Sequence, residues 1–361
     1  MAWGKIAVTQ PARSNVERAF LPHVHMLRAV AILIVVGAHC WPNFAWTPAE
    51  TRVIHAVFDI ITMVMMFISG LLFQHLSGRF RYARYVKHRF SMIILPYVIV
   101  SIPALVIVIF FHHREDVWPW VYDMPAWKQA AFFLLTGKHM APMWFMPMIA
   151  LFILAAPAFI LIDRRNLYPV VLPVTLLISM WLGRDTDLGL GAGLGGVLGK
   201  AVFTLPAYIS GMAFSRYRAT IEDWCQRHVL ALALAVAGLT AVIVAGAYPA
   251  LDLTMPQKIL FGMLLLTLFQ RIDFGPVITR RMGMIADQSF AIYFIHGYVI
   301  TALRLAADGA RPAALAGGIA QPTETAVGLI SLMVFSTLVS LLVVQISRHV
   351  FGRRSRMIVG A

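Results

Sequence analysis

Charged residues are scarce in this chain of 361 residues: they make up 13% of it, against 60% hydrophobic residues. A soluble globular domain has about a quarter charged residues and about 45–50% apolar residues. Acidic residues are the scarcer kind, with 16 Asp and Glu against 30 Lys and Arg. Together with a mean hydropathy of +0.78, this composition excludes an ordinary soluble domain and indicates a polytopic membrane protein.

Cysteine is almost absent, since Cys40 and Cys225 are the only two in the chain. The topology predicted below places them on opposite faces of the membrane, which excludes an intramolecular disulfide framework, and their spacing offers no metal site. The first 20 residues lack an apolar core long enough for a cleavable signal peptide. We therefore expect the first apolar span to serve as its own targeting signal.

Apolar runs occur throughout the chain, with no internal repeat between them. A helix needs about 20 apolar residues to cross a bilayer, so the shorter runs need help from neighbouring helices or interfacial anchors. We expect a transmembrane domain at 26–345 between an N-terminal segment, 1–25, and a basic tail, 346–361. The fold class predicted is all-α, with about ten transmembrane helices at about 26–42, 56–73, 90–111, 144–162, 167–183, 198–214, 229–248, 256–270, 289–304 and 326–345.

The formal net charge of +14 is distributed in a way that indicates topology and not nucleic-acid binding. If the N-terminus is cytoplasmic, about two thirds of the 30 Lys and Arg residues lie on the cytoplasmic side, including the basic stretch 79–90. This asymmetry follows the positive-inside rule. We predict that both termini are cytoplasmic, that the protein lies in the lipid bilayer of a bacterial inner membrane, and that nucleic acid is not a partner.

Two ionisable residues, Arg28 and His39, stand inside the first apolar span, MLRAVAILIVVGAHC (26–40). Such side chains are expensive at membrane depth, so a span that keeps two of them usually has a function for them. At 100° and about 1.5 Å per residue, eleven residues return the helix to within roughly 20° of the starting face and advance it about 16 Å. Arg28 and His39 are therefore predicted to share one face, half a bilayer apart.

These residues belong to a series of motifs that resembles the acyltransferase-3 family, integral membrane enzymes that move acyl groups from coenzyme A thioesters to carbohydrates and other cell-envelope acceptors. The first motif is Arg28, ten residues and His39. The others follow in the family's order and are FISGLL (67–72), KHRFSMIILPY (87–97), MWFMP (143–147) and SFAIYFIH (289–296). The resemblance covers about residues 25–345.

The chain departs from the family's pattern at two places. Many members carry an acidic residue three positions before the first-span arginine, where this chain has His25. Many also carry a second arginine near the proline of the third motif, where this chain has Met92 and Ile93. The first departure puts an acid–arginine pair in doubt, and the second suggests different cofactor contacts. Some polysaccharide-modifying members resemble this chain in carrying the single-arginine, LPY-type entry and no fused hydrolase-like domain.

The resemblance implies that His39 is the general base, because acyl transfer to a hydroxyl needs a group that takes the hydroxyl proton, and imidazole has a suitable ordinary pKa. A histidine hydrogen-bonded at the interface is the alternative, and a covalent acyl-imidazole intermediate stays open. Asp59 is a third catalytic candidate that could orient His39 or could cap a helix.

Arg28 is predicted to bind the phosphates or pantetheine amides of acyl-CoA, because guanidinium forks to phosphate oxygens. Snorkelling to lipid head groups is the alternative. Arg84, Lys87 and Arg89 could complete an electropositive cup, or could serve only the positive-inside rule. Ser69 is a further cofactor-binding candidate, although small residues also permit close helix approach without any catalytic meaning.

Candidate substrate-binding residues lie in the later motifs and the loop before them. For Trp144 the alternative role is to anchor the fourth span. For Tyr293 and His296 the alternative is a packing role, in which His296 is hydrogen-bonded to a backbone carbonyl. Trp118, Trp120 and Trp127 fit either interfacial anchoring or acceptor binding. The predicted substrate-binding set is Trp144, His139, Tyr293 and His296, and no metal site is predicted.

The function predicted is transfer of an acyl group from cytoplasmic acyl-CoA, as co-substrate, to a hydroxyl of a surface or exported polysaccharide or lipid-linked sugar. The resemblance implies acetyl as the usual group. Succinyl, from succinyl-CoA, is the alternative, its second carboxylate held by Arg114, Lys128, Lys138 or Arg184. A transporter or flippase that uses Arg28 and His39 in a solute or proton path is the rival class, although the internal symmetry common in transporters is not visible. The retained Arg28 and His39 argue against a scaffold with a relic site.

Overall fold

The computed structural model describes residues 21–58, 61–184, 186–189, 193–247, 250–310 and 322–360. Helices are the only regular secondary structure in these ranges, which confirms the all-α prediction. The α-helices are α1 (Pro22–Cys40), α2 (Pro48–Phe58), α3 (Thr62–Leu76), α4 (Tyr82–Arg89), α5 (Leu95–Phe110), α6 (Pro119–Tyr122), α7 (Ala126–Thr136), α8 (Phe145–Leu154), α9 (Ala156–Arg164), α10 (Tyr168–Leu182), α11 (Leu194–Arg216), α12 (Arg218–Arg227), α13 (Val229–Ala245), α14 (Thr254–Arg271), α15 (Gly275–Asp287), α16 (Ser289–Ala310), α17 (Pro322–Phe351) and α18 (Ser355–Ile358). Short 3-10 turns and one π-helical segment join some of them, namely η1 (Trp41–Asn43), η2 (Ser77–Arg79), the π-helical η3 (Phe90–Ile94), η4 (Ala141–Trp144) and η6 (Gly352–Arg354).

Within the described residues the ten predicted spans fall mainly on helices, but fewer than ten helices are long and apolar enough to count as candidate membrane spans. Within the described residues, five helical stretches are long and apolar enough to cross a membrane, or up to seven if two bent pairs each count as one span. The pair α7 with η4 and α8 bends by 70°, and the pair α12 with α13 bends by 82°. The predicted span 144–162 is also divided at Ala155, into α8 and α9.

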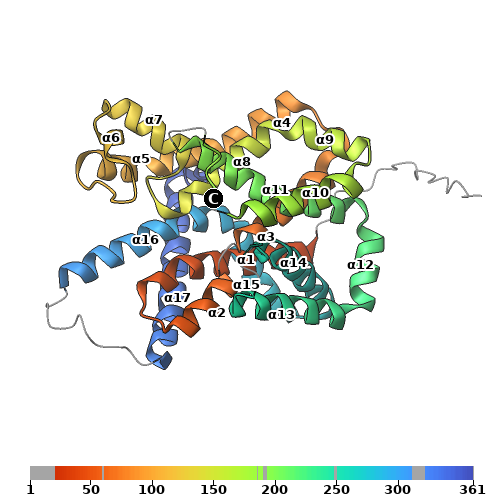
Figure 1. Ribbon diagram of the computed structural model, residues 1–361. Coiled ribbons are helices and arrows are strands. Elements are labelled where there is room, and N and C mark those ends of the chain that lie inside the picture. Colours follow the sequence, from red (N-terminus) through yellow and green to blue (C-terminus); the bar gives the residue numbers. More distant parts are fainter. Residues whose placement is uncertain are drawn as a thin grey trace, which may run out of the picture.

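Helix α1 lies at the centre of the bundle, where it contacts α3, α14, α15, α16 and α17 (Figure 1). Leu27, Ala29, Ile32 and Val36 on different sides of this helix are almost completely buried. A helix that is apolar all round has no face suited to water and is buried in a core or membrane. Arg28 and His39 are thereby carried on a helix that is packed inside the bundle.

Helices α3 and α11 form the most extensive helix pair of the fold. Glycines on both sides bring the two backbones together. A Cβ atom added at Gly70 of α3 would lie 1.9 Å from the carbonyl oxygen of Tyr208, and one added at Gly211 of α11 would lie 1.9 Å from the carbonyl oxygen of Phe67. Small residues commonly permit such close approach between membrane helices.

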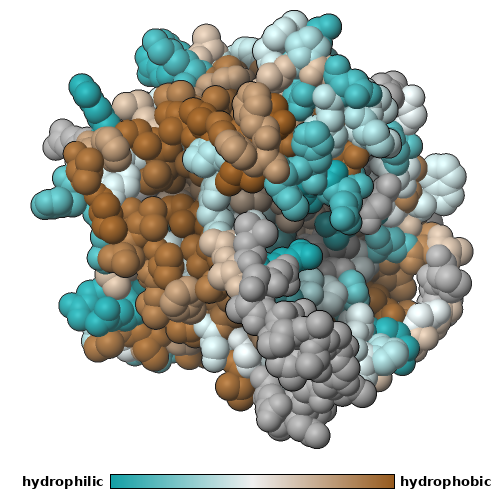
Figure 2. Space-filling model, turned by 90° about the vertical axis from the view of Figure 1, so that its left-hand side faces the viewer, coloured by the Kyte–Doolittle hydropathy of each residue, from teal (hydrophilic) through white to brown (hydrophobic). Residues whose placement is uncertain are grey.

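The outer surface carries a broad hydrophobic area (Figure 2). On α17 the exposed apolar residues recur every three to four positions at Val327, Ile330, Val334, Leu338 and Leu342. This spacing forms one helix face, and a contiguous apolar surface of this kind is expected where a protein contacts lipid.

The C-terminal segment does not leave the bundle where the predicted tail begins. The boundary at 345/346 lies inside α17, and after η6 the chain turns so that α18 packs on α5 and η3. Ser355 is buried, and Val359 packs against the core. The C-terminus therefore lies against the helices that carry part of the site described next.

Candidate active site

One stripe of α1 connects the two ionisable residues of the first span. Arg28, Ile32 and Val35 all line the same cavity, and His39 continues their spacing of four, three and four residues. Residues at this spacing lie on one helix face. The structure therefore agrees with the prediction that Arg28 and His39 share a face of an unbroken helix.

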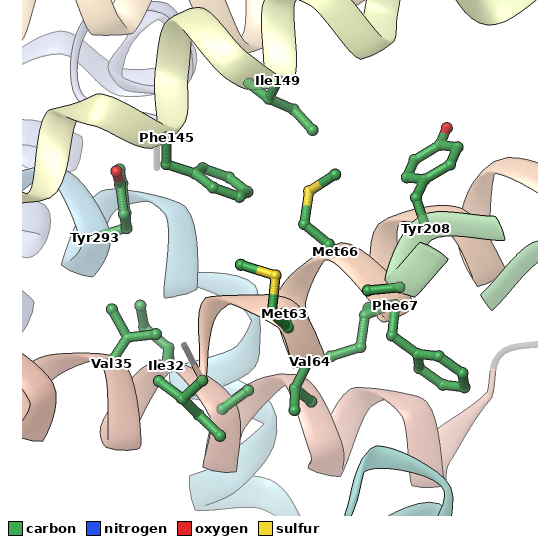
Figure 3. Packing of buried hydrophobic residues seen from close by; sticks show 14 of the residues in the cluster. Ile32, Val35, Met63, Val64, Met66, Phe67, Phe145, Ile149, Tyr208 and Tyr293 are labelled. Carbon is green, nitrogen blue, oxygen red and sulfur yellow. The ribbon is translucent and has the colours of Figure 1, made fainter. Parts of the chain in front are cut away.

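The cavity that this stripe lines has a volume of about 170 Å³ and is mostly apolar. Figure 3 shows its walls: Ile32 and Val35 of α1 lie opposite Phe145 and Ile149 of α8. Tyr293 of α16 stands on one side of this space, and Tyr208 of α11 lies beyond Met66 on the other. Helix α3 contributes Thr62, Met65, Ile68, Ser69, Leu72 and Phe73 to the lining. Ser69 lines the cavity although its hydroxyl donates to the carbonyl of Met65 at 2.8 Å.

Arg28 forms the polar end of the cavity. Its Nε donates a hydrogen bond to Oγ of Ser289 at 2.7 Å, across 261 residues of sequence. Arg89 and Tyr85 also line this end, and the Arg89 guanidinium lies 5.5 Å from the centre of the Tyr85 ring. Arg28 therefore points into the bundle.

An acidic residue stands near Arg28 although the family's usual position for it holds His25. Asp287, the last residue of α15, interacts electrostatically with Arg28. Its Oδ1 lies 3.5 Å from Nε2 of His25. Asp287 lies on a helix that is distant in sequence from Arg28. His25 stands three positions before Arg28, where many family members have an acidic residue, and it contacts Asp287.

His39 forms a pair with His296 at the other end of the stripe. Their ring centroids are 5.2 Å apart, with the rings tilted by 44°. His296 is fully buried, and its Nδ1 lies 3.0 Å from the carbonyl oxygen of Ile292. Tyr293 stands between this pair and the cavity, because its ring lies 6.0 Å from that of His296 while its side chain also lines the cavity. Its hydroxyl donates to the carbonyl of Pro142.

The other predicted substrate-binding residues lie around this end in different settings. Trp144 is half-buried, and its ring lies 5.6 Å from the guanidinium of Arg184, which also interacts electrostatically with His39. His139 is buried with both ring nitrogens in contact: Nδ1 is 3.1 Å from the carbonyl of Phe133, and Nε2 is 2.9 Å from Oγ of Ser101. His139 thus connects α7 to α5, and the structure gives it no free nitrogen for a substrate.

The predicted electropositive cup is brought together only in part. Arg89 lines the cavity, whereas Arg84 and Lys87 are exposed on α4 and do not line it. Asp59 lies outside the described residues. The sequence reasoning missed Ser289, Asp287, Tyr85 and Tyr208. Ser289 opens the SFAIYFIH motif, which was the available signal for it.

The chain matches the family model described as "Acyltransferase domain" over residues 22–345. It belongs to the acyltransferase-3 family. This membership confirms the family predicted from the motifs and makes the chain a multi-pass membrane acyltransferase. It gives the transporter alternative no support. No curated protein and no solved structure matches the chain.

Proposed function

We propose that this acyltransferase-3 protein transfers an acyl group from acyl-CoA to a hydroxyl of a cell-envelope carbohydrate. The observation that carries the proposal is the stripe on α1, in which Arg28, Ile32 and Val35 line one cavity and His39 follows at the same spacing. The stripe places a guanidinium at one end of an apolar cavity and an imidazole one helical turn beyond Val35, outside the lining of that cavity. Acyl transfer from a long anionic donor needs a group that binds its phosphates and a base near its thioester.

The Arg28 end suits the phosphates of coenzyme A. Because Ser289 accepts the Nε–H of Arg28, the two terminal nitrogens of the guanidinium are left to donate to phosphate oxygens. Arg89 adds a second guanidinium to the same end. Guanidinium groups bind phosphate through two parallel hydrogen bonds. The separation of about 16 Å between Arg28 and His39 along the helix is comparable with an extended pantetheine arm.

The His39 end supplies the base. In the proposed reaction the acceptor oxygen attacks the thioester carbonyl while its proton moves to a ring nitrogen of His39. The C–S bond then breaks, and the thiolate of coenzyme A takes the proton from His39 to leave as the thiol. General base catalysis of this kind contributes roughly 10²–10⁴-fold to a rate.

The acyl group is proposed to be acetyl, with succinyl as the second candidate. Of the four cations considered for a second carboxylate, Arg114 pairs with Asp116, while Lys128 and Lys138 lie over Trp127 and Trp118. Arg184 is the one that interacts electrostatically with His39. A succinyl donor would therefore be favoured by Arg184, and comparison of acetyl-CoA with succinyl-CoA as donors separates the two.

The proposal also assigns the two faces of the membrane. With both termini cytoplasmic, as the positive-inside rule predicts, Arg28 would lie toward the cytoplasm, where acyl-CoA is made. His39 would lie toward the opposite face, where an exported polysaccharide or lipid-linked sugar of a bacterial inner membrane is acylated.

The deciding experiment measures free thiol released from acetyl-CoA by purified protein in vesicles, with and without an extract of envelope glycans. Acceptor-dependent thiol release by the wild type and its loss in His39→Ala are expected. His349→Ala, which removes an exposed histidine near the end of α17, is the matched control and should keep wild-type activity. No thiol release by the wild type with acetyl-CoA or succinyl-CoA would refute the proposal, and full activity of His39→Ala would refute the assignment of the base.

A further inference from the structure

The hydrogen bonding of His296 determines which of its ring nitrogens carries the proton. Nδ1 lies 3.0 Å from the carbonyl oxygen of Ile292, one helical turn earlier. A carbonyl oxygen can only accept a hydrogen bond, so Nδ1 must donate and therefore carries the proton of the neutral ring. Nε2 is then left with an unprotonated lone pair. The backbone of α16 fixes this tautomer.

No group in the described part of the chain donates a hydrogen bond to the lone pair of Nε2. Nε2 of His296 is buried and has no hydrogen-bond partner there. Buried polar atoms in proteins are nearly always hydrogen-bonded, so an exception calls for an explanation, such as a catalytic role or a bound group. His139 provides the contrast, because both of its ring nitrogens have partners.

The groups around His296 leave His39 as the natural partner for this lone pair. The nearby Tyr293 hydroxyl already donates to the carbonyl of Pro142. The ring of His39 lies 5.2 Å from that of His296, centroid to centroid. This separation allows an N–H···N contact of about 3 Å once the two nitrogens face each other. Helix α1 would then hold the donor and α16 the acceptor.

We infer that His296 is a positioning residue for the base: its Nε2 accepts the N–H of His39 and thereby turns the other, unprotonated nitrogen of His39 toward the acceptor hydroxyl. The inference rests on the proposed acyl transfer. It follows the general arrangement in which a base is oriented by a third group. Here the third group is neutral, so the apolar interior does not have to hold a buried carboxylate.

The proton balance is simple. When the acceptor oxygen attacks the thioester carbonyl, the hydroxyl proton passes to the unprotonated nitrogen of His39. The other N–H of the resulting imidazolium continues to donate its hydrogen bond to Nε2 of His296. When the C–S bond breaks, the same proton passes from His39 to the thiolate. The Nδ1–H of His296 donates to the Ile292 carbonyl oxygen throughout, and His296 exchanges no proton.

The first test compares two substitutions at position 296. His296→Leu removes the acceptor and should lower kcat about 100-fold or more, while the KM for acyl-CoA stays within about twofold. His296→Gln offers an amide oxygen as acceptor, and its kcat should be at least about tenfold higher than that of His296→Leu. Ser336→Ala is the control, because Oγ of Ser336 contacts the backbone carbonyl of His296 at 3.5 Å without touching the ring. It should keep wild-type kcat.

The outcomes separate this inference from the proposed function. If the wild type turns over and His39→Ala does not, but His296→Leu keeps wild-type kcat, the positioning role is overturned and the proposed function stands. A raised KM with unchanged kcat in His296→Leu would also overturn it, since that pattern indicates substrate binding. A wild type without turnover would overturn both.

A second measurement reads the tautomer in the wild-type protein and does not depend on the activity of a variant. Nitrogen-15 NMR of the wild-type protein, labelled at histidine and reconstituted in lipid, reports which nitrogen of each neutral imidazole is protonated. The His296 signal is identified by its absence from the His296→Gln spectrum. Protonation at Nδ1 supports the inference, and protonation at Nε2 would overturn it whatever the activity shows.

Discussion

Arg28 is held in a polar setting that accounts for its place inside an apolar helix. Ser289 takes its Nε–H, and Asp287 provides a negative charge nearby. An ionisable residue at membrane depth is expected to be paired in this way. One hydrogen bond to a hydroxyl leaves the rest of the guanidinium directed at the cavity. Arg28 thus combines a fixed Nε with terminal nitrogens for which no hydrogen bond is found among the described residues.

Arg28→Lys should therefore impair the enzyme although it keeps the charge. A lysine ammonium is a point donor and cannot both bind Ser289 and fork to a phosphate. We expect the KM for acyl-CoA to rise about tenfold, the loss of about 1.4 kcal/mol of binding. Arg280→Lys, on the exposed face of α15, serves as the control. An unchanged KM with an unchanged rate would show that Arg28 has only a structural role.

The basic residues of the 84–89 stretch should differ in their effect on the KM for acyl-CoA, because the structure places them differently. Arg89 lines the cavity, whereas Arg84 is exposed and does not. Arg89→Gln should raise the KM for acyl-CoA about tenfold, by loss of a charged hydrogen bond to phosphate. Arg84→Gln should change it by less than about twofold. Equal effects of the two substitutions would contradict this distinction and support the wider electropositive cup expected from the sequence.

At the scale of elements, the π-helical segment η3 joins α4 to α5 directly after Arg89. π-Helical turns are rare and frequently occur at functional sites. Ile93 within η3 lines the cavity, as Arg89 does. An extra residue in a turn changes which side chains face the bundle. The segment therefore sets the direction of Arg89 relative to the apolar face of α5.

The contact of α3 with α11 gives a prediction about stability. In Gly211→Ala the new methyl group would lie 1.9 Å from the carbonyl oxygen of Phe67, and a backbone atom cannot yield as a flexible side chain can. Overpacking of this kind costs typically about 1–3 kcal/mol, so the apparent Tm in detergent should fall by several degrees. Gly238→Ala in α13 is the matched control, because no atom lies within 4 Å of the added Cβ. Equal Tm values for the two variants would contradict the close approach.

Local periodicity predicted part of this molecule and could not predict the rest. The stripe from Arg28 to His39 follows from helix geometry alone, so it was visible in the sequence. The hydrogen bond from Arg28 to Ser289 joins residues 261 positions apart, and no local pattern encodes such a contact. The division at Ala155 was missed for a related reason, since an apolar run reads the same whether its helix is straight or broken.

At the scale of the whole molecule, the C-terminal segment shows the same limit. Its basic residues predicted a separate cytoplasmic tail, but α18 packs on α5 and η3. A Cβ atom added at Gly360 would lie 2.9 Å from Phe290, which lines the cavity. Arg356 of α18 interacts electrostatically with Arg28. Composition identified the charge of this segment, and only tertiary packing shows where it lies.

The length of the donor should matter, because Arg28 and His39 lie at opposite ends of the stripe. If the phosphates are held near Arg28 and Arg89, the thioester must reach His39, about 16 Å further along α1. A donor that carries the acyl group on cysteamine alone cannot occupy both ends at once. In reconstituted vesicles its kcat/KM should therefore be at least about 100-fold lower than that of intact acyl-CoA, because the binding energy of the remote phosphates is lost to the reaction. The spontaneous rate of each thioester with the glycan extract alone is the control. Comparable enzymatic rates for both donors, or labelling of position 39 from the side of the membrane that holds Arg28, would contradict transfer through the bundle and would place the chemistry at one face.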